Sequence, residues 1–171
     1  MSKKPKYEYE NFLEDARMLE WVREENLDKI AQFHNIFTQE GLSLNIKSNK
    51  TTPFILNYTN KRKGVFSLYL KEKGLTGILK AHNVADYGDV FTELPNEMIE
   101  NIQNSPMCKN LARKTEDEKG CGWKDCFGYD FNIEDVNLQI CRYSCFQFEV
   151  TDETTAHLEK LALCELTLQR K

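Results

Sequence analysis

The chain lacks the long apolar run that a membrane helix needs. Nowhere in its 171 residues does an apolar stretch approach the roughly 18 residues of a membrane span. Its first ten residues hold three lysines around a proline, followed by alternating tyrosine and glutamate, without the apolar core of a secretory signal. We therefore expect a cytosolic protein with no membrane partner, in a compartment where disulfides rarely persist.

The sequence also lacks the motifs of the common enzyme classes. It contains no G-x-S-x-G elbow, no H-E-x-x-H, no P-loop and no dinucleotide fingerprint. Among its three histidines, His82 is followed by Asp86 and is the candidate acid or base. A non-enzymatic domain that binds a ligand or a partner protein is the first interpretation. A small enzyme that depends on a cysteine or on His82 is the alternative.

Cysteine, in contrast, is concentrated in one part of the chain. All of the six cysteines except Cys164 fall in one short stretch that also holds Trp123: Cys108, Cys121, Cys126, Cys141 and Cys145. Without disulfides, they are metal ligands, a redox-active thiol pair or small buried side chains. The function of this stretch depends on which sulfurs the fold brings together.

An expected β-hairpin predicts which of these cysteines lie close together. Residues 127–133 alternate apolar and polar, 134–137 form a turn, and 138–150 return as one long strand. With 133 and 138 flanking the turn, Phe131 faces Ile140, and Cys126 faces Cys145 with the two Cβ atoms about 5 Å apart. Cys141 lies about 13 Å from Cys145 along the same strand, too far to share one zinc ion.

The register therefore predicts a zinc site from four cysteines. The proposed ligands are Cys108, Cys121, Cys126 and Cys145. The glycine-containing loop 120–125 would bring Cys121 back, and Cys108 would arrive from the end of the preceding helix. Paired C-x-x-C knuckles, the usual signature of structural zinc, are missing. A redox-active pair and inert packing thus remain alternatives to zinc.

The middle of the chain is strongly basic, although the whole chain has a net charge of −4. Between residues 42 and 82, Glu72 is the only acid. The cations there are Lys47, Lys50, Lys61, Arg62, Lys63, Lys71, Lys73 and Lys80. Clustered cations attract phosphate-bearing or carboxylate ligands, whereas solvated hairpin tips carry lysine without any ligand.

Hydrophobic periodicity predicts an α+β fold. The helical pattern of 11–41 ends at Gly41, which suits a left-handed cap. Period-two patterns at 44–47, 54–59, 65–70 and 75–81 predict a four-strand antiparallel meander, with turns that close on Gly64 and Gly74. A helix at 95–105 and a helix at 152–169 follow the same logic, the latter capped by Thr151 or Asp152.

We thus expect one domain, 1–171, with a twisted antiparallel sheet packed against N- and C-terminal helices. Residues 1–10 are expected to be flexible, 11–41 helical, 42–82 the basic meander, and 108–150 the cysteine-rich loop and the C-terminal hairpin. The oligomeric state is left open.

Aromatic residues interleave with lysines in the meander. Phe54, Tyr58, Phe66 and Tyr69 could form a stacking platform for single-stranded nucleic acid. Aromatics at period two are normally core, and no RNP-like motif occurs. We therefore expect core positions, and keep a nucleic-acid-binding accessory protein as a further alternative.

Part of the chain resembles a group of small proteins. The segment 53–150, with Phe54-Ile55-Leu56-Asn57-Tyr58, Ser67-Leu68-Tyr69-Leu70, Cys126-Phe127-Gly128-Tyr129-Asp130-Phe131 and Cys141-Arg142-Tyr143, is similar to uncharacterised small bacterial proteins of the domain-of-unknown-function type. The resemblance implies a compact α+β fold in the cytosol. It implies no activity and no catalytic residues.

Overall fold

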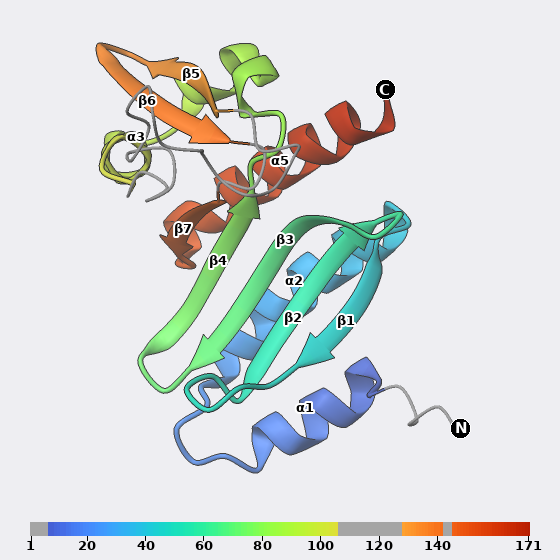
Figure 1. The fold of residues 1–171 in the computed structure, drawn as a ribbon. Helices are drawn as coiled ribbons and strands as arrows, with labels where there is room; N and C mark the ends of the chain where they lie inside the picture. Colours follow the sequence, from blue (N-terminus) through green and yellow to red (C-terminus); the bar gives the residue numbers. More distant parts are fainter. Residues whose placement is uncertain (1–6, 106–127, 142–144) are drawn as a thin grey trace, which may run out of the picture.

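The computed structural model describes residues 7–105, 128–141 and 145–171 (Figure 1). Two helices come first, α1 (Tyr9–Arg17) and α2 (Glu24–Gln39), and the meander follows as β1 (Ser43–Lys47), β2 (Phe54–Asn60), β3 (Lys63–Lys71) and β4 (Gly74–Lys80). Two short 3-10 helices (Val84–Asp86 and Gly88–Glu93), α3 (Asn96–Gln103), the hairpin β5 (Gly128–Ile133) and β6 (Val136–Cys141), β7 (Cys145–Glu149) and α5 (Asp152–Arg170) complete these elements. The predicted α+β class is confirmed.

The main sheet has five antiparallel strands in the order β1-β2-β3-β4-β7. Its first four strands are the predicted meander, and β7 pairs with β4 after a long excursion of the chain. The hairpin of β5 and β6 forms a separate two-stranded sheet. The fifth strand of the main sheet, β7, therefore comes from a part of the chain far in sequence from the four strands of the meander.

Helices α2 and α5 lie on one face of this sheet (Figure 1). On α2, the ring centroid of Phe33 lies 5.3 Å from that of Phe66, and the ring centroid of Phe37 lies 4.9 Å from that of Tyr58. An added Cβ at Gly77 would contact Leu158 of α5 at 3.4 Å, which places α5 on the same face. The apolar core fills the space between these two helices and the sheet.

Helix ends follow local sequence signals. Gly41 has φ +73° beyond the end of α2, while the N–H groups of Gly41 and Leu42 donate to the carbonyls of Thr38 and Phe37 at 2.9 Å. This is the glycine-terminated cap that the sequence predicts. At α5, the hydroxyl of Thr151 accepts from the N–H of Thr154, and the hydroxyl of Thr154 accepts in return from the N–H of Thr151.

The predicted register of the second hairpin is wrong by two residues. In the structure Phe131 pairs with Leu138 and Ile133 pairs with Val136, so a two-residue turn replaces the expected four-residue turn. Glu134 adopts φ +50°, a left-handed conformation that lets so short a turn close. Shifting by two keeps the same residues on the same face, which is why alternation alone did not reveal the error.

The long return strand predicted for 138–150 does not form as one strand. β6 ends at Cys141 and β7 begins at Cys145, which pairs with Lys80 of β4 and not with the first hairpin strand. The side chains of Phe146 and Phe148 are buried in the main core, and this burial favours pairing with the meander. The reasoning that set Cys126 opposite Cys145 therefore fails.

Candidate functional site

The second face of the five-stranded sheet carries no helix of the described residues (Figure 1). Strand register places three rows of side chains on this uncovered face. The rows are Lys47, Ile55, Tyr69, Thr76 and Glu149; then Asn45, Asn57, Ser67, Ile78 and Gln147; then Ser43, Thr59, Lys80 and Cys145. We call this surface the uncovered face.

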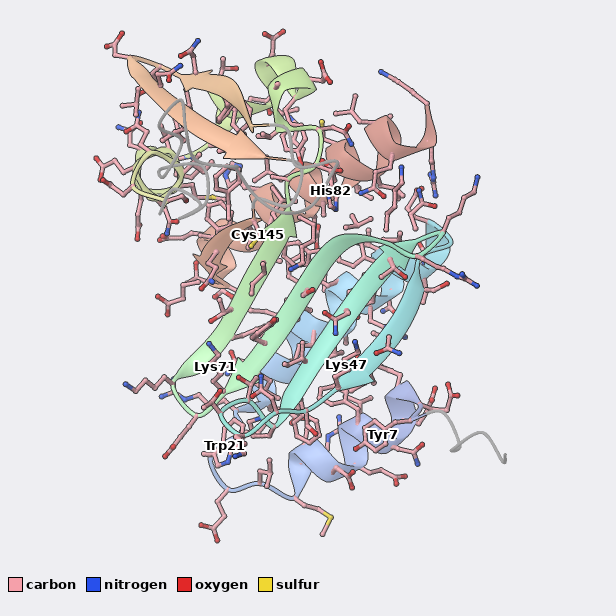
Figure 2. All side chains as sticks on the ribbon, in the orientation of Figure 1. Tyr7, Trp21, Lys47, Lys71, His82 and Cys145 are labelled. Carbon is pink, nitrogen blue, oxygen red and sulfur yellow. The ribbon has the colours of Figure 1, made fainter. Side chains whose placement is uncertain are left out.

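The charge of the uncovered face is mainly positive. Lys47, Lys71 and Lys80 lie on it by register, and Glu149 is the single acid among its described residues. Figure 2 shows Lys47 and Lys71 toward the same end of the sheet, and Cys145 toward the other. Because the whole chain is negative, this face is a local region of opposite sign that attracts anions.

Polar and apolar side chains are combined in the middle of this face. The hydroxyl of Ser67 donates to Oδ1 of Asn57 at 2.9 Å, which links neighbouring strands. Ile55 and Ile78, which share this face by register, are buried. The Lys71 ammonium lies 5.5 Å from the centroid of the Tyr69 ring, and a hollow of about 330 Å³ opens between Lys71 and Gln147.

A strained basic turn joins β2 to β3 at one end of the sheet. Asn60 pairs with Lys63, so Lys61 and Arg62 alone form the turn, with φ +46° and +73°. Both are exposed, as is Lys63. Two positive φ values are normally met by Asn-Gly, because other L-residues are strained there. The predicted glycine-closed turn is therefore wrong: Gly64 lies inside β3 and does not supply a positive φ.

The aromatic residues of the meander divide between the two faces. Tyr58 and Phe66 are fully buried under α2, and Phe54 packs against Phe12 of α1 at 5.1 Å between centroids. Only Tyr69 of the four candidates lies on the uncovered face. Core positions are thus confirmed for Tyr58 and Phe66, and the four rings do not form a stacking platform.

Three of the four proposed zinc ligands, Cys108, Cys121 and Cys126, lie outside the described residues. Cys145 is an exposed free thiol on β7, and Cys164 is a half-buried free thiol on α5. The part of the chain that the structure describes contains no group of three or more metal-binding side chains. The zinc site stays a prediction, now without its hairpin geometry.

His34 lies in an aromatic cluster between the N-terminal helices and the sheet. Its ring stacks on Tyr9 with centroids 3.7 Å apart, and its Nδ1 lies 3.3 Å from the hydroxyl of Tyr58. Burial lowers the pKa of His34, against an opposing influence of Glu10. Burial also raises the pKa of Tyr9 to about 12. The cluster thus places the His34 ring between Tyr9 of α1 and Tyr58 of β2, while His82 lies just past the end of β4.

One charged side chain that the sequence places on the apolar stripe of the last helix is fully buried. Glu165 accepts hydrogen bonds from the backbone N–H of Asn83 at 3.1 Å and from its side-chain amide at 2.9 Å. The hydroxyl of Tyr87 and the amide of Gln169 donate to the same carboxylate, at 2.7 and 2.9 Å. The carboxylate holds the segment after β4 against α5, which is a structural role.

The described helices include none that is long and apolar enough to cross a membrane. Comparisons with protein-family models, with curated proteins and with solved structures found no match to this chain. The resemblance to small bacterial proteins accordingly stays a prediction, and the function is argued from the surface alone.

Proposed function

We propose that this chain is a non-enzymatic binding domain whose uncovered sheet face receives an acidic segment of a partner protein. The observation that carries the proposal is the charge of that face, where three lysines stand against one glutamate in a chain of net charge −4. Basic surfaces of this kind steer acidic partners and raise their association rate.

The composition of the face favours protein over nucleic acid. Single-stranded nucleic acid is usually held by successive aromatic rings, and among the described residues Tyr69 is the one aromatic that register places on the face. The amides of Asn45, Asn57 and Gln147 instead suit the hydrogen-bonding groups of a polypeptide.

The proposal includes a cytosolic setting. Cys145 and Cys164 are free thiols, which is compatible with a reducing compartment. A zinc site formed by Cys108, Cys121, Cys126 and Cys145 would stabilise the domain without taking part in this binding.

Binding of poly-L-glutamate, followed by fluorescence anisotropy at low and high salt, tests the proposed function. Lys47→Gln and Lys71→Gln should each weaken binding roughly twofold to fivefold, since exposed charge pairs contribute modestly. Lys160→Gln is the matched control, because it removes the same charge from an exposed position on α5, away from the uncovered face. Equal effects of all three variants, or tighter binding of oligo(dT) than of poly-L-glutamate, would contradict the proposal.

A further inference from the structure

The two edges of the five-stranded sheet are protected differently. At one edge, α3 packs against β7. At the other edge, β1 pairs with β2 and with no other strand of the described residues. Figure 1 shows β1 at the outer margin of the sheet. No described strand therefore uses the outward backbone N–H and C=O groups of β1, which could pair with a further strand.

β1 also lacks the features that normally prevent strand addition. Its five residues contain no proline, its register with β2 has no bulge, and its single charge, Lys47, is at its last position. Leu44 and Ile46 point toward the helix-covered side and are only partly buried, so their apolar surface continues to the edge. An added strand could extend the core there.

Cations lie near both ends of this free edge. Ser43 pairs with Thr59, which brings the first end of β1 next to the basic turn of Lys61 and Arg62. Lys47 closes the second end. The nearest acid in sequence before β1, Glu40, is paired with Arg170 at 3.1 Å and so contributes little negative charge.

The strain of the basic turn strengthens this charge argument. Two cations occupy left-handed positions where Asn-Gly would be more stable. Strain of this kind accumulates at functional positions. The turn thus retains charge at the expense of local stability, next to the free edge.

We propose that the acidic partner segment adds to β1 as a sixth strand, with acidic and apolar side chains alternating along it. Its acidic side chains lie on the uncovered face beside Ser43, Asn45 and Lys47, and its apolar side chains lie beside Leu44 and Ile46. The segment is held by backbone hydrogen bonds, and the alternation supplies selectivity. This inference rests on the proposed function, because it names how the acidic partner binds.

The test uses a peptide of about eight residues in which valine and glutamate alternate, a length typical of a strand. Two further peptides carry N-methyl groups on all valines or on all glutamates. Alternate N–H groups of a strand point to opposite edges, so only one of the two sets faces β1. One methylated peptide should bind like the parent, and the other at least about tenfold more weakly, since several backbone hydrogen bonds are lost.

Protein variants at the edge supply a second measurement. The Asn45→Glu variant should bind the parent peptide severalfold more weakly than the unchanged protein does, whereas the Asn45→Lys variant should bind it at least as tightly. Peptide binding should also slow amide hydrogen exchange in β1. If both methylated peptides bind like the parent, or both are weakened equally, the sixth strand is refuted while the uncovered face remains the binding surface.

Two other results would overturn this inference, the first of them together with the proposed function. If neither the peptide nor poly-L-glutamate binds, both proposals fall. If sedimentation shows a dimer that Asn45→Lys dissociates, the occupant of the edge is a second copy of the chain, and the partner strand is refuted.

Discussion

Replacing the basic turn by Asn-Gly should stabilise the protein and at the same time weaken its binding. In Lys61→Asn/Arg62→Gly, both left-handed positions receive residues that tolerate a positive φ. Each L-residue other than glycine costs roughly 1 kcal/mol in this conformation, and the substitution relieves that cost. The added glycine offsets part of the gain, because it increases the conformational entropy of the unfolded chain. We expect a net gain of about 1 kcal/mol.

The gain is measured by urea unfolding and by thermal unfolding, where it corresponds to a rise in Tm of about 2–4 °C for a chain of this size. Affinity for poly-L-glutamate should fall roughly threefold to tenfold in the same variant, because two exposed charges are lost. Stability should therefore rise while affinity for poly-L-glutamate falls.

The control is Lys61→Gln/Arg62→Gln, which removes the same two charges and keeps the unfavourable φ values. It should weaken binding equally with little change in stability. If the Asn-Gly variant is no more stable than this control, the turn is not strained and the argument from strain is refuted. If neither variant loses affinity, the turn plays no part in binding.

Four further predictions concern stability and metal content. Glu165→Ala should reduce the free energy of unfolding by at least about 3 kcal/mol, since four hydrogen bonds to a buried carboxylate are lost. Gly77→Ala should destabilise by about 1–3 kcal/mol, because its Cβ would lie 2.7 Å from the Phe66 ring. The free energy of unfolding should decrease as the pH is lowered below 6.5, because the unfolded chain protonates His34 before the folded chain does. Zinc bound by the reduced protein should be lost in Cys126→Ser.

Each of these has a control. Glu165→Gln keeps the shape of the side chain and should lower the free energy of unfolding less than the alanine variant does. For Gly77→Ala the control is Gly41→Ala, whose added Cβ contacts no other atom, so that it tests backbone strain alone. In His34→Gln, the urea midpoint should depend less on pH than in the parent, and an equal dependence would show that another group titrates. Cys141→Ser should keep its zinc, and a reduced chain without any metal would rule out the zinc site.

Local features of the fold could be predicted from the sequence, because neighbouring residues decide them. The left-handed cap at Gly41, the start of α5 at Thr151 and the period-two strands all depend on residues a few positions apart. Turns were less predictable. A glycine next to a turn suggested where it would close, but at Lys61 and Arg62 the chain accepts strain that no propensity would favour.

The surface that we propose for binding could be predicted only in part. A basic segment was evident from the sequence, yet its lysines become one surface only because register aligns alternate residues of separate strands. Glu165 lay within an apolar stripe, which gave a sign of its burial. Its partners, Asn83 and Tyr87, come from a distant segment and could not be inferred.

The amino-acid sequence by itself determined the α+β class, the meander and the helix ends, since hydrophobic period and capping are local properties. Tertiary structure decided that β7 joins β4, that Cys145 leaves the hairpin, and that the described helices cover only one face of the sheet. Those outcomes depend on competition among distant apolar faces for burial in one core. Because Phe146 and Phe148 are buried in the main core beside the meander, packing settles the order of the strands, and with it the surface that we propose for binding.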